Sequence, residues 1–207
     1  MHNKKINKTD YSDLSESIIS DFKVSAKTSI YRKSESVPLR QLLKCGCIKG
    51  SVLNFGKGKY DTDSARIRAE VGNCTDYDYT YAPLSLELFG HHFVTAIAIY
   101  VVNTLPLRAR TIVYQQMADA TRKDGRAYFA VRSDKDTGIR GVAHYETDES
   151  GNIYQDGVMT TRGTYQIGFS PEQIKKETSG YFQFSRIISY KSGYLIIECS
   201  HSAISNG

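Results

Sequence analysis

The stretch SVLNFGKGKYDTD, residues 51–63, decides the fold. Its first five residues form a short apolar run, which is typical of a strand buried on both faces of a parallel sheet. Gly56 and Gly58 then permit a tight turn, and a helix is predicted to begin near Asp63. A strand, a glycine turn and a helix in this order favour a loop that binds a nucleotide or nucleoside.

An acid at a defined distance completes this pattern. Nucleoside sites of this kind hold the ribose hydroxyls with a carboxylate at the end of the next strand, about 20 residues beyond the turn. The predicted strand CTDYDY (74–79) carries Asp76 and Asp78, which strand alternation places on one face. Asp78 lies nearer the carboxyl end and is the favoured ribose ligand. Tyr79 follows it and is placed to pack on an adenine ring.

Strands and helices alternate along the rest of the chain. The predicted helices cover residues 38–45, 63–72, 108–125 and 170–179, and the predicted strands cover 51–55, 74–79, 93–102, 126–133, 181–190 and 194–200. This alternation indicates an α/β fold, a doubly wound and mostly parallel sheet, with a terminal antiparallel hairpin.

The domain organisation follows from changes in composition. Residues 1–25 are polar and predict an arm or helix outside the main fold, whereas residues 26–207 predict a single domain. The glycine-rich and polar stretch at about 133–168 predicts an insertion that is a loop or a hairpin.

Composition limits the class of protein. The chain has 207 residues, 40% of them hydrophobic, and a formal net charge of +5, which permits an anionic partner without requiring one. No apolar run of about 18 residues and no secretory signal is evident, so a cytoplasmic protein without a membrane span is expected. Cys45 and Cys47 stand too close for a comfortable bridge, so all four cysteines are expected to be reduced. No metal-ligand pattern is present, and no metal is expected.

Four segments in the same order carry a resemblance to a known family. They are KTSIYRKSESVPLRQLLKCGCIKGSVLNFGKGKYD (27–61), YDYTYAP (77–83), YVVNTLPLRARTIVYQQMADATRKDGRAYFAVRSD (100–134) and VMTTRGTYQIGFSPEQI (158–174). Together they resemble class I S-adenosylmethionine-dependent methyltransferases, and more narrowly those of phages and of bacterial DNA phosphorothioation loci. The resemblance implies a seven-stranded Rossmann-like sheet and S-adenosylmethionine as cofactor.

The resemblance also implies which residues contact the cofactor. These are Asn54, Phe55, Gly56, Gly58, Asp61, Asp78, Tyr79 and Asn103. The loop departs from the family pattern, because Asn54 replaces the usual aspartate, Lys57 a cysteine and Tyr60 the third glycine. Lys57 could pair with the carboxylate of the ligand or repel its sulfonium, and both readings stay open.

The acceptor side of the site is expected in two further segments. Asn103 begins NTLP (103–106), where such folds contact the substrate or donor, although a strand-end turn is an equal alternative. The segment TTRGTYQIGF (160–169) could line an acceptor pocket or brace a loop. Asn103 and Tyr165 are the predicted catalytic residues, and Arg162, Thr164 and Gln166 are the predicted substrate ligands.

Three functions remain open at this stage. Methylation of DNA, RNA or a nucleotide is favoured by the family and by the mild basic charge. The altered loop also suits an inactive module that binds DNA or protein, and an enzyme that cleaves S-adenosylmethionine is a third possibility. The sequence leaves the oligomeric state open.

Overall fold

The computed structural model describes residues 14–83, 89–90, 92–147 and 150–204, so residues 1–13 of the predicted arm lie outside the described part. Its centre is a six-stranded sheet in the order β2-β1-β3-β4-β9-β8. The strands are β1 (Val52–Phe55), β2 (Thr75–Tyr77), β3 (Phe93–Ile99), β4 (Thr121–Val131), β8 (Phe184–Tyr190) and β9 (Leu195–Ser200). β1 to β4 are mutually parallel, and β9 and β8 run antiparallel to their neighbours.

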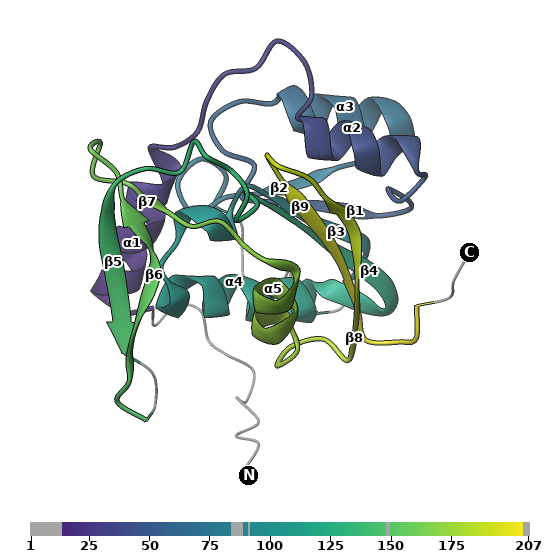
Figure 1. The fold of residues 1–207 in the computed structure, drawn as a ribbon. Helices are drawn as coiled ribbons and strands as arrows, with labels where there is room; N and C mark the ends of the chain where they lie inside the picture. The colour runs from purple at the N-terminus through teal and green to yellow at the C-terminus, as the bar shows by residue number, and fades with distance from the viewer. Residues whose placement is uncertain (1–13, 84–88, 91, 148–149, 205–207) are drawn as a thin grey trace.

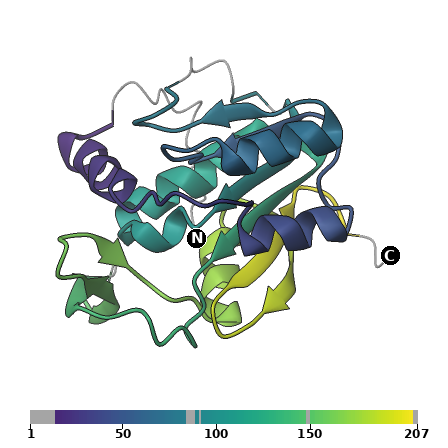
Figure 2. The same cartoon turned by 90° about the horizontal axis from the view of Figure 1, so that it is seen from above.

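Helices cover both faces of this sheet (Figures 1 and 2). The helices are α1 (Glu16–Ala26), α2 (Val37–Lys44), α3 (Thr62–Val71), α4 (Leu107–Ala120) and α5 (Pro171–Thr178). One core cluster joins α1, α4 and α5 to the sheet, and a second joins α2 and α3 to its other face. Alternate residues of β4 enter alternate clusters, with Phe129 in the first and Tyr128 in the second, as strand geometry requires.

The doubly wound α/β fold and the terminal hairpin predicted from the sequence are therefore confirmed. All six strands that the sequence located individually form within a few residues of their predicted positions. The seventh strand, expected only from the family resemblance, is not found among the described residues.

The insertion forms a separate small sheet. It contains β5 (Val142–Thr147), β6 (Ile153–Met159) and β7 (Tyr165–Gln166), all antiparallel. In Figure 1 this sheet lies beside α1, on the opposite side of the view from α2 and α3. A hairpin was one of the two structures expected here, and β7 adds a third strand to it.

The predicted helix over residues 108–125 is too long at its carboxyl end. α4 ends at Ala120, and β4 begins at Thr121 without a loop. Gly125 is not a helix cap, because it lies in β4 where a Cβ would stand 2.8 Å from the carbonyl oxygen of Phe93. The pairing of β3 with β4 shifts register in this region, so the glycine permits close backbone approach at a bulge.

The first helix packs on the main fold, contrary to the expectation that it lies outside. Phe22 of α1 is buried in the core, and Asp21 forms an ion pair with Arg108 of α4 at 2.7 Å. The sequence signal that was missed is the short apolar face of α1. One or two large apolar side chains are enough to pack a helix on a core.

The expectation of reduced cysteines is wrong for one pair. Cys45 and Cys47 form a disulfide directly after α2, with their Cα atoms 5.4 Å apart. Gly46 between them has φ +64°, a left-handed conformation that turns the chain back on itself. This turn brings two residues in i, i+2 positions within the Cα separation that a disulfide accepts. No helix in the described part of the chain is both long and apolar enough to cross a bilayer.

Candidate functional site

A pocket opens at the carboxyl ends of the parallel strands. Its volume is about 730 Å³, and its lining includes the ends of β1 and β3, the residues that follow β2 and β4, and the connection from α1 to α2. In open α/β sheets the crevice at this edge is where ligands bind. Its volume suits a ligand of cofactor size, since small-molecule sites usually measure about 300–1,000 Å³.

The two glycines of the loop after β1 are both required by the backbone. Gly56 has φ +70° and Gly58 has φ +72°, conformations that other residues adopt only under strain. A Cβ on Gly56 would stand 2.4 Å from a methyl carbon of Val101, and one on Gly58 would stand 2.6 Å from the hydroxyl oxygen of Ser29. The loop therefore passes between neighbours that leave no room for a side chain.

Asp78 holds this loop in place. Its carboxylate accepts hydrogen bonds from the main-chain N–H groups of Gly58 (2.9 Å), Thr80 (2.8 Å) and Tyr81 (3.0 Å). Asp78 also lines the pocket. A carboxylate offers about four acceptor positions, so these three bonds leave capacity for one more donor.

Asp76 has a different environment from Asp78, although alternation predicted a shared face. Asp76 accepts a hydrogen bond from the Ser64 hydroxyl at 2.5 Å and pairs with Arg68, both on α3. The prediction is wrong because β2 ends at Tyr77, so Asp78 already lies beyond the regular strand. Asn54 shares the polar contacts of Asp76: its amide donates to Ser64 at 3.0 Å and to Asp76 at 3.4 Å.

Aromatic side chains form part of the wall. Phe55 is buried and packs against Tyr77, with ring centroids 4.9 Å apart. Tyr79 stacks on Phe22 of α1 at 3.8 Å, and its hydroxyl donates to Gln116 of α4 at 2.6 Å. One face of the Tyr79 ring is thus covered by α1, a contact that the sequence did not indicate.

The residues that depart from the family loop do not fill the pocket. Lys57 and Tyr60 both line it, and the volume of about 730 Å³ is what remains beside them. The Lys57 ammonium pairs with the carboxylate of Asp61, and this hydrogen bond lowers the pKa of Asp61. Asp61 itself is largely exposed and does not line the pocket.

Asn103 lies in the short 3-10 helix η3 (Val102–Thr104) and lines the pocket. Its main-chain carbonyl accepts from Ile167 N–H at 2.9 Å. The side chain is 1% exposed, and its Oδ1 atom has no hydrogen-bond partner within the described residues. Buried acceptors are almost always satisfied, so this one requires a partner that the described side chains do not supply.

Sequence reasoning missed Tyr100, which precedes η3. The predicted strand continues to residue 102, but β3 ends at Ile99 because Tyr100 has φ +59°. It has the one positive φ among the non-glycine residues that the structure describes. A non-glycine residue in this region costs about 1–3 kcal/mol and persists where surrounding contacts enforce it. No local signal in the run FVTAIAIYVV marks this position.

Of the three predicted substrate ligands, Gln166 alone lines the pocket. Arg162 is exposed at the turn between β6 and β7, and the Thr164 hydroxyl bonds that of Thr160 at 2.8 Å across the same turn. Tyr165 is 3% exposed and points instead into a cluster around Arg110.

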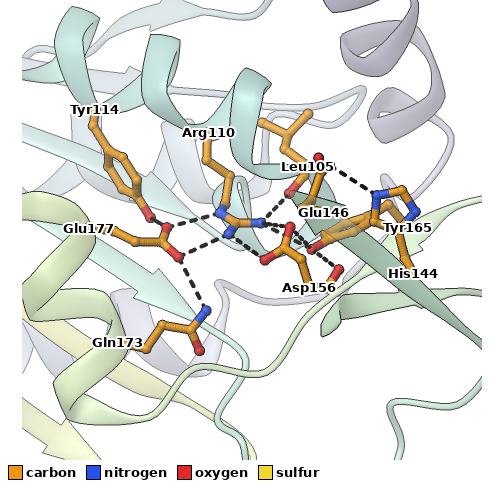
Figure 3. Close-up of polar contacts among 9 residues, drawn as sticks. All are labelled: Leu105, Arg110, Tyr114, His144, Glu146, Asp156, Tyr165, Gln173 and Glu177. Carbon is orange, nitrogen blue, oxygen red and sulfur yellow. Dashed lines mark hydrogen bonds and ion pairs between the residues drawn. The ribbon is translucent and has the colours of Figure 1, made fainter. Parts of the chain in front are cut away.

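Figure 3 shows this cluster, with the Arg110 guanidinium at its centre. Arg110 is fully buried and bonds both carboxylate oxygens of Asp156 (2.8 and 3.0 Å) and of Glu177 (2.9 Å each). Burial alone would lower the pKa of Arg110, but the hydrogen bond with Asp156 and the charge of Glu177 hold it well above its ordinary value. The arginine thus joins α4 to β6 and α5.

Tyr165 is held by the same network. Its hydroxyl accepts from Arg110 at 3.0 Å and donates to the main-chain carbonyl of Asp156 at 2.6 Å. Burial raises the pKa of Tyr165 well above its ordinary value, so the phenol stays protonated. The catalytic role predicted for Tyr165 does not fit this position, because the side chain is committed to the network and lines no part of the pocket.

No metal-binding group of three or more histidine, cysteine, aspartate or glutamate side chains occurs within the described residues. The polar side chains that line the pocket are carboxylates, amides, hydroxyls, ammonium groups and guanidinium groups.

No family model and no curated protein matches the sequence, but solved structures match the fold. The DhpI complex with S-adenosylhomocysteine aligns with a TM-score of 0.58 and 14% identity over 90% of this chain and 98% of that chain. A 1,6-didemethyltoxoflavin-N1-methyltransferase of Burkholderia thailandensis, with 1,6-didemethyltoxoflavin and S-adenosylhomocysteine bound, aligns with a TM-score of 0.52 and 14% identity. That alignment covers 79% of this chain and 76% of that chain. An S-adenosylmethionine-dependent methyltransferase of Bacteroides fragilis, in complex with S-adenosylhomocysteine, aligns with a TM-score of 0.52 and 14% identity over 82% of this chain and 79% of that chain. The chain thus has the Rossmann-like fold of class I S-adenosylmethionine-dependent methyltransferases.

Proposed function

We propose that this chain is an S-adenosylmethionine-dependent methyltransferase that acts on a nucleotide or a nucleic acid. The observation that carries the proposal is the pocket whose lining brings together Gly56, Gly58, Asp78 and Asn103, a residue whose Oδ1 has no partner among the described residues. All four are at the strand ends where this fold binds its ligand. The methyltransferase fold itself supports the same reading.

The residues present fit the cofactor. Gly56 and Gly58 leave backbone bare at the pocket wall, and the remaining acceptor capacity of Asp78 suits a ribose hydroxyl. Phe55 and Tyr79 offer aromatic surface for an adenine ring. When bound, S-adenosylmethionine would supply a methyl group carried on a sulfonium. Asn54 contacts α3 through its side chain, so its part in binding is to shape the wall.

Lys57 is positioned for an ionic role. It lines the pocket while its ammonium pairs with Asp61, so the net charge of the pair is near zero. We favour pairing with the carboxylate of the cofactor over repulsion of its sulfonium, because an ammonium has three N–H donors and its bond to Asp61 leaves two of them for a second carboxylate. Asp61 thus acts on the cofactor through Lys57.

Asn103 is the proposed contact to the reacting groups. Its Oδ1 atom has no hydrogen-bond partner among the described residues, so it can accept a hydrogen bond from an amine or hydroxyl of the molecule that is methylated. Methyl transfer depends chiefly on the alignment of donor and acceptor, so an orienting amide is sufficient and a general base is not required. Gln166 on β7 is the one predicted substrate ligand that lines the pocket together with Asn103.

The acceptor class rests on the family resemblance and on charge. The resemblance to methyltransferases of phages and of bacterial DNA phosphorothioation loci favours a nucleic acid or nucleotide, and the net charge of +5 is compatible with one. A pocket of about 730 Å³ admits a single nucleotide beside the cofactor, so a polymer would have to present an extruded base.

Binding and product analysis together test the proposal. We expect S-adenosylmethionine and S-adenosylhomocysteine to bind the purified protein in calorimetry and to raise its melting temperature. Incubation with S-adenosylmethionine and a mixture of nucleotides should then yield S-adenosylhomocysteine and a methylated product by mass spectrometry. Absence of binding would point to an inactive module. Cofactor breakdown without a methylated product would point to a cleaving enzyme.

A further inference from the structure

The pocket has a second half, on the side of the sheet formed by β3 and β4. The glycine loop and Asp78 follow β1 and β2, whereas Tyr100 and Arg132 follow β3 and β4. Because the strand order is β2-β1-β3-β4, these two pairs of residues occupy opposite sides of the crevice. Both Tyr100 and Arg132 line the pocket, together with Arg32 from the connection between α1 and α2.

Arg32 differs from the other arginines of the pocket in its pairing within the described residues. Arg40, Lys57 and Arg132 line the same pocket, and each forms an ion pair with an acidic side chain. Arg32 forms none with any carboxylate in the described ranges, and its guanidinium lies over the ring of Tyr100 at 5.8 Å. An arginine held on an aromatic face keeps its N–H donors available to a ligand in the pocket.

Tyr100 is held in a strained conformation that fixes this ring. Its φ is +59°, and its N–H donates to the carbonyl of Ala130 at 2.7 Å, which ties the ends of β3 and β4 together. Burial raises the pKa of Tyr100, while the charges of Arg32 and Arg132 lower it. Arg132 follows Ala130 by two residues, so it begins at the same strand ends as Tyr100, whose ring Arg32 covers.

Arg132 is oriented from two sides. Its Nε donates to Asp136 at 2.8 Å and its Nη1 to Gln166 at 3.3 Å. The hydrogen bond from Arg132 lowers the pKa of Asp136, so the pair stays ionised. The Arg132–Asp136 pair is nearly neutral, so the cations of the pocket lining that have no ion pair among the described residues are Arg32 and its exposed neighbour Lys33.

We propose that Arg32, Tyr100 and Arg132 form an oxyanion subsite that binds a phosphate group of the acceptor. A guanidinium offers a planar fork of donors that matches phosphate, and phosphate carries more negative charge than a carboxylate at neutral pH. Its three oxygens can accept from two guanidinium groups together. The subsite rests on the proposed function, because it assigns the acceptor of that reaction to molecules that carry a phosphate.

Calorimetric titration of inorganic phosphate into protein saturated with S-adenosylhomocysteine tests the subsite. The bound product excludes phosphate from the cofactor half of the pocket. We expect Arg32→Gln to weaken phosphate binding at least tenfold, as expected for loss of a charge-assisted contact. Tyr100→Leu should weaken it about two- to fivefold through loss of the aromatic support of Arg32.

Arg122→Gln is the matched control, because Arg122 is exposed, pairs with Asp124 and lies outside the pocket. It should bind phosphate as the unaltered protein does, and Arg32→Gln should keep its affinity for S-adenosylhomocysteine. Equal phosphate affinity in Arg32→Gln and the unaltered protein would overturn the subsite. So would the lack of phosphate binding at millimolar concentrations, or acetate binding as tightly as phosphate.

A repeat titration without S-adenosylhomocysteine separates this inference from the proposed function. If S-adenosylhomocysteine does not bind but phosphate binding still depends on Arg32, the proposed function fails and the subsite stands. If S-adenosylhomocysteine binds and phosphate does not, the subsite fails and the proposed function stands.

Discussion

At the scale of single residues, Arg110 has the largest structural consequence. Its guanidinium satisfies two carboxylates, the carbonyl of Leu105 and the hydroxyl of Tyr165 in a site without solvent exposure. Because Leu105 directly follows η3, the network also fixes the segment that carries Asn103. An arginine in an otherwise ordinary amphipathic helix gives no sequence signal of this kind, since its partners lie 46 and 67 residues away.

Arg110→Met should lower the free energy of unfolding by about 3–5 kcal/mol, because it leaves the buried carboxylate of Asp156 and the partly buried one of Glu177 without their partner. Urea denaturation followed by circular dichroism measures this. Arg122→Met, at an exposed pair, should change it by less than about 0.5 kcal/mol. Equal losses in the two variants would mean that the Arg110 network is not the stabilising contact described above.

Asp78→Ala should weaken binding of S-adenosylmethionine tenfold or more. It removes the proposed ribose acceptor, a charge-assisted bond worth about 1.5–3 kcal/mol, and also frees the N–H of Gly58. Calorimetry on the folded variant measures the affinity. Asp124→Ala, which alters an exposed carboxylate outside the pocket, is the control. Unchanged affinity in Asp78→Ala would remove Asp78 from the site.

Cysteine reactivity checks the disulfide and the burial of the other two thiols. Burial raises the pKa of Cys74 to about 12 and that of Cys199 to about 12. Since the thiolate is the reactive form, neither should be alkylated quickly in the native protein at pH 8. Peptide mapping should find Cys45 and Cys47 labelled only after reduction. Label on either before reduction would contradict the disulfide.

At the scale of elements, the sequence predicts those helices and strands whose limits are set by residues nearby in the chain. Short apolar runs mark β1, which lies between glycines, and β3. Ser170 followed by Pro171 marks the start of α5, where the Ser170 hydroxyl caps the helix. The errors arise where a contact with a residue distant in the sequence sets the limit of a helix or strand. α4 passes straight into β4 because Gly125 packs against β3, and no residue near position 120 signals that contact.

Gly125→Ala should lower the free energy of unfolding by about 1–3 kcal/mol, as overpacking does, because the new Cβ would stand 2.8–2.9 Å from two carbonyl oxygens of β3. Gly180→Ala is the matched control, since a Cβ there meets nothing within 4 Å. Urea denaturation compares them. A Gly125→Ala variant as stable as the control would show that the bulge is not tightly packed.

At the scale of the whole molecule, the cofactor half of the pocket was more predictable than the acceptor half. Gly56, Gly58 and Asp78 belong to one sequence motif, and the structure brings them to one pocket. Arg32, Tyr100 and Arg132 come from three separate segments. Their proximity depends on strand order, and Tyr100 on a backbone conformation that its sequence context does not indicate.

The central claim is that the crevice over Gly56 holds S-adenosylmethionine, and a comparison of two glycine variants tests it most directly. Gly56→Ala and Gly72→Ala both place alanine at a positive φ, but only the first drives a Cβ against Val101, whereas the second faces open space outside the pocket. We predict that calorimetry finds S-adenosylhomocysteine binding weakened at least tenfold in Gly56→Ala and unchanged in Gly72→Ala. Equal affinity in both variants, or no binding to the unaltered protein, would contradict the claim.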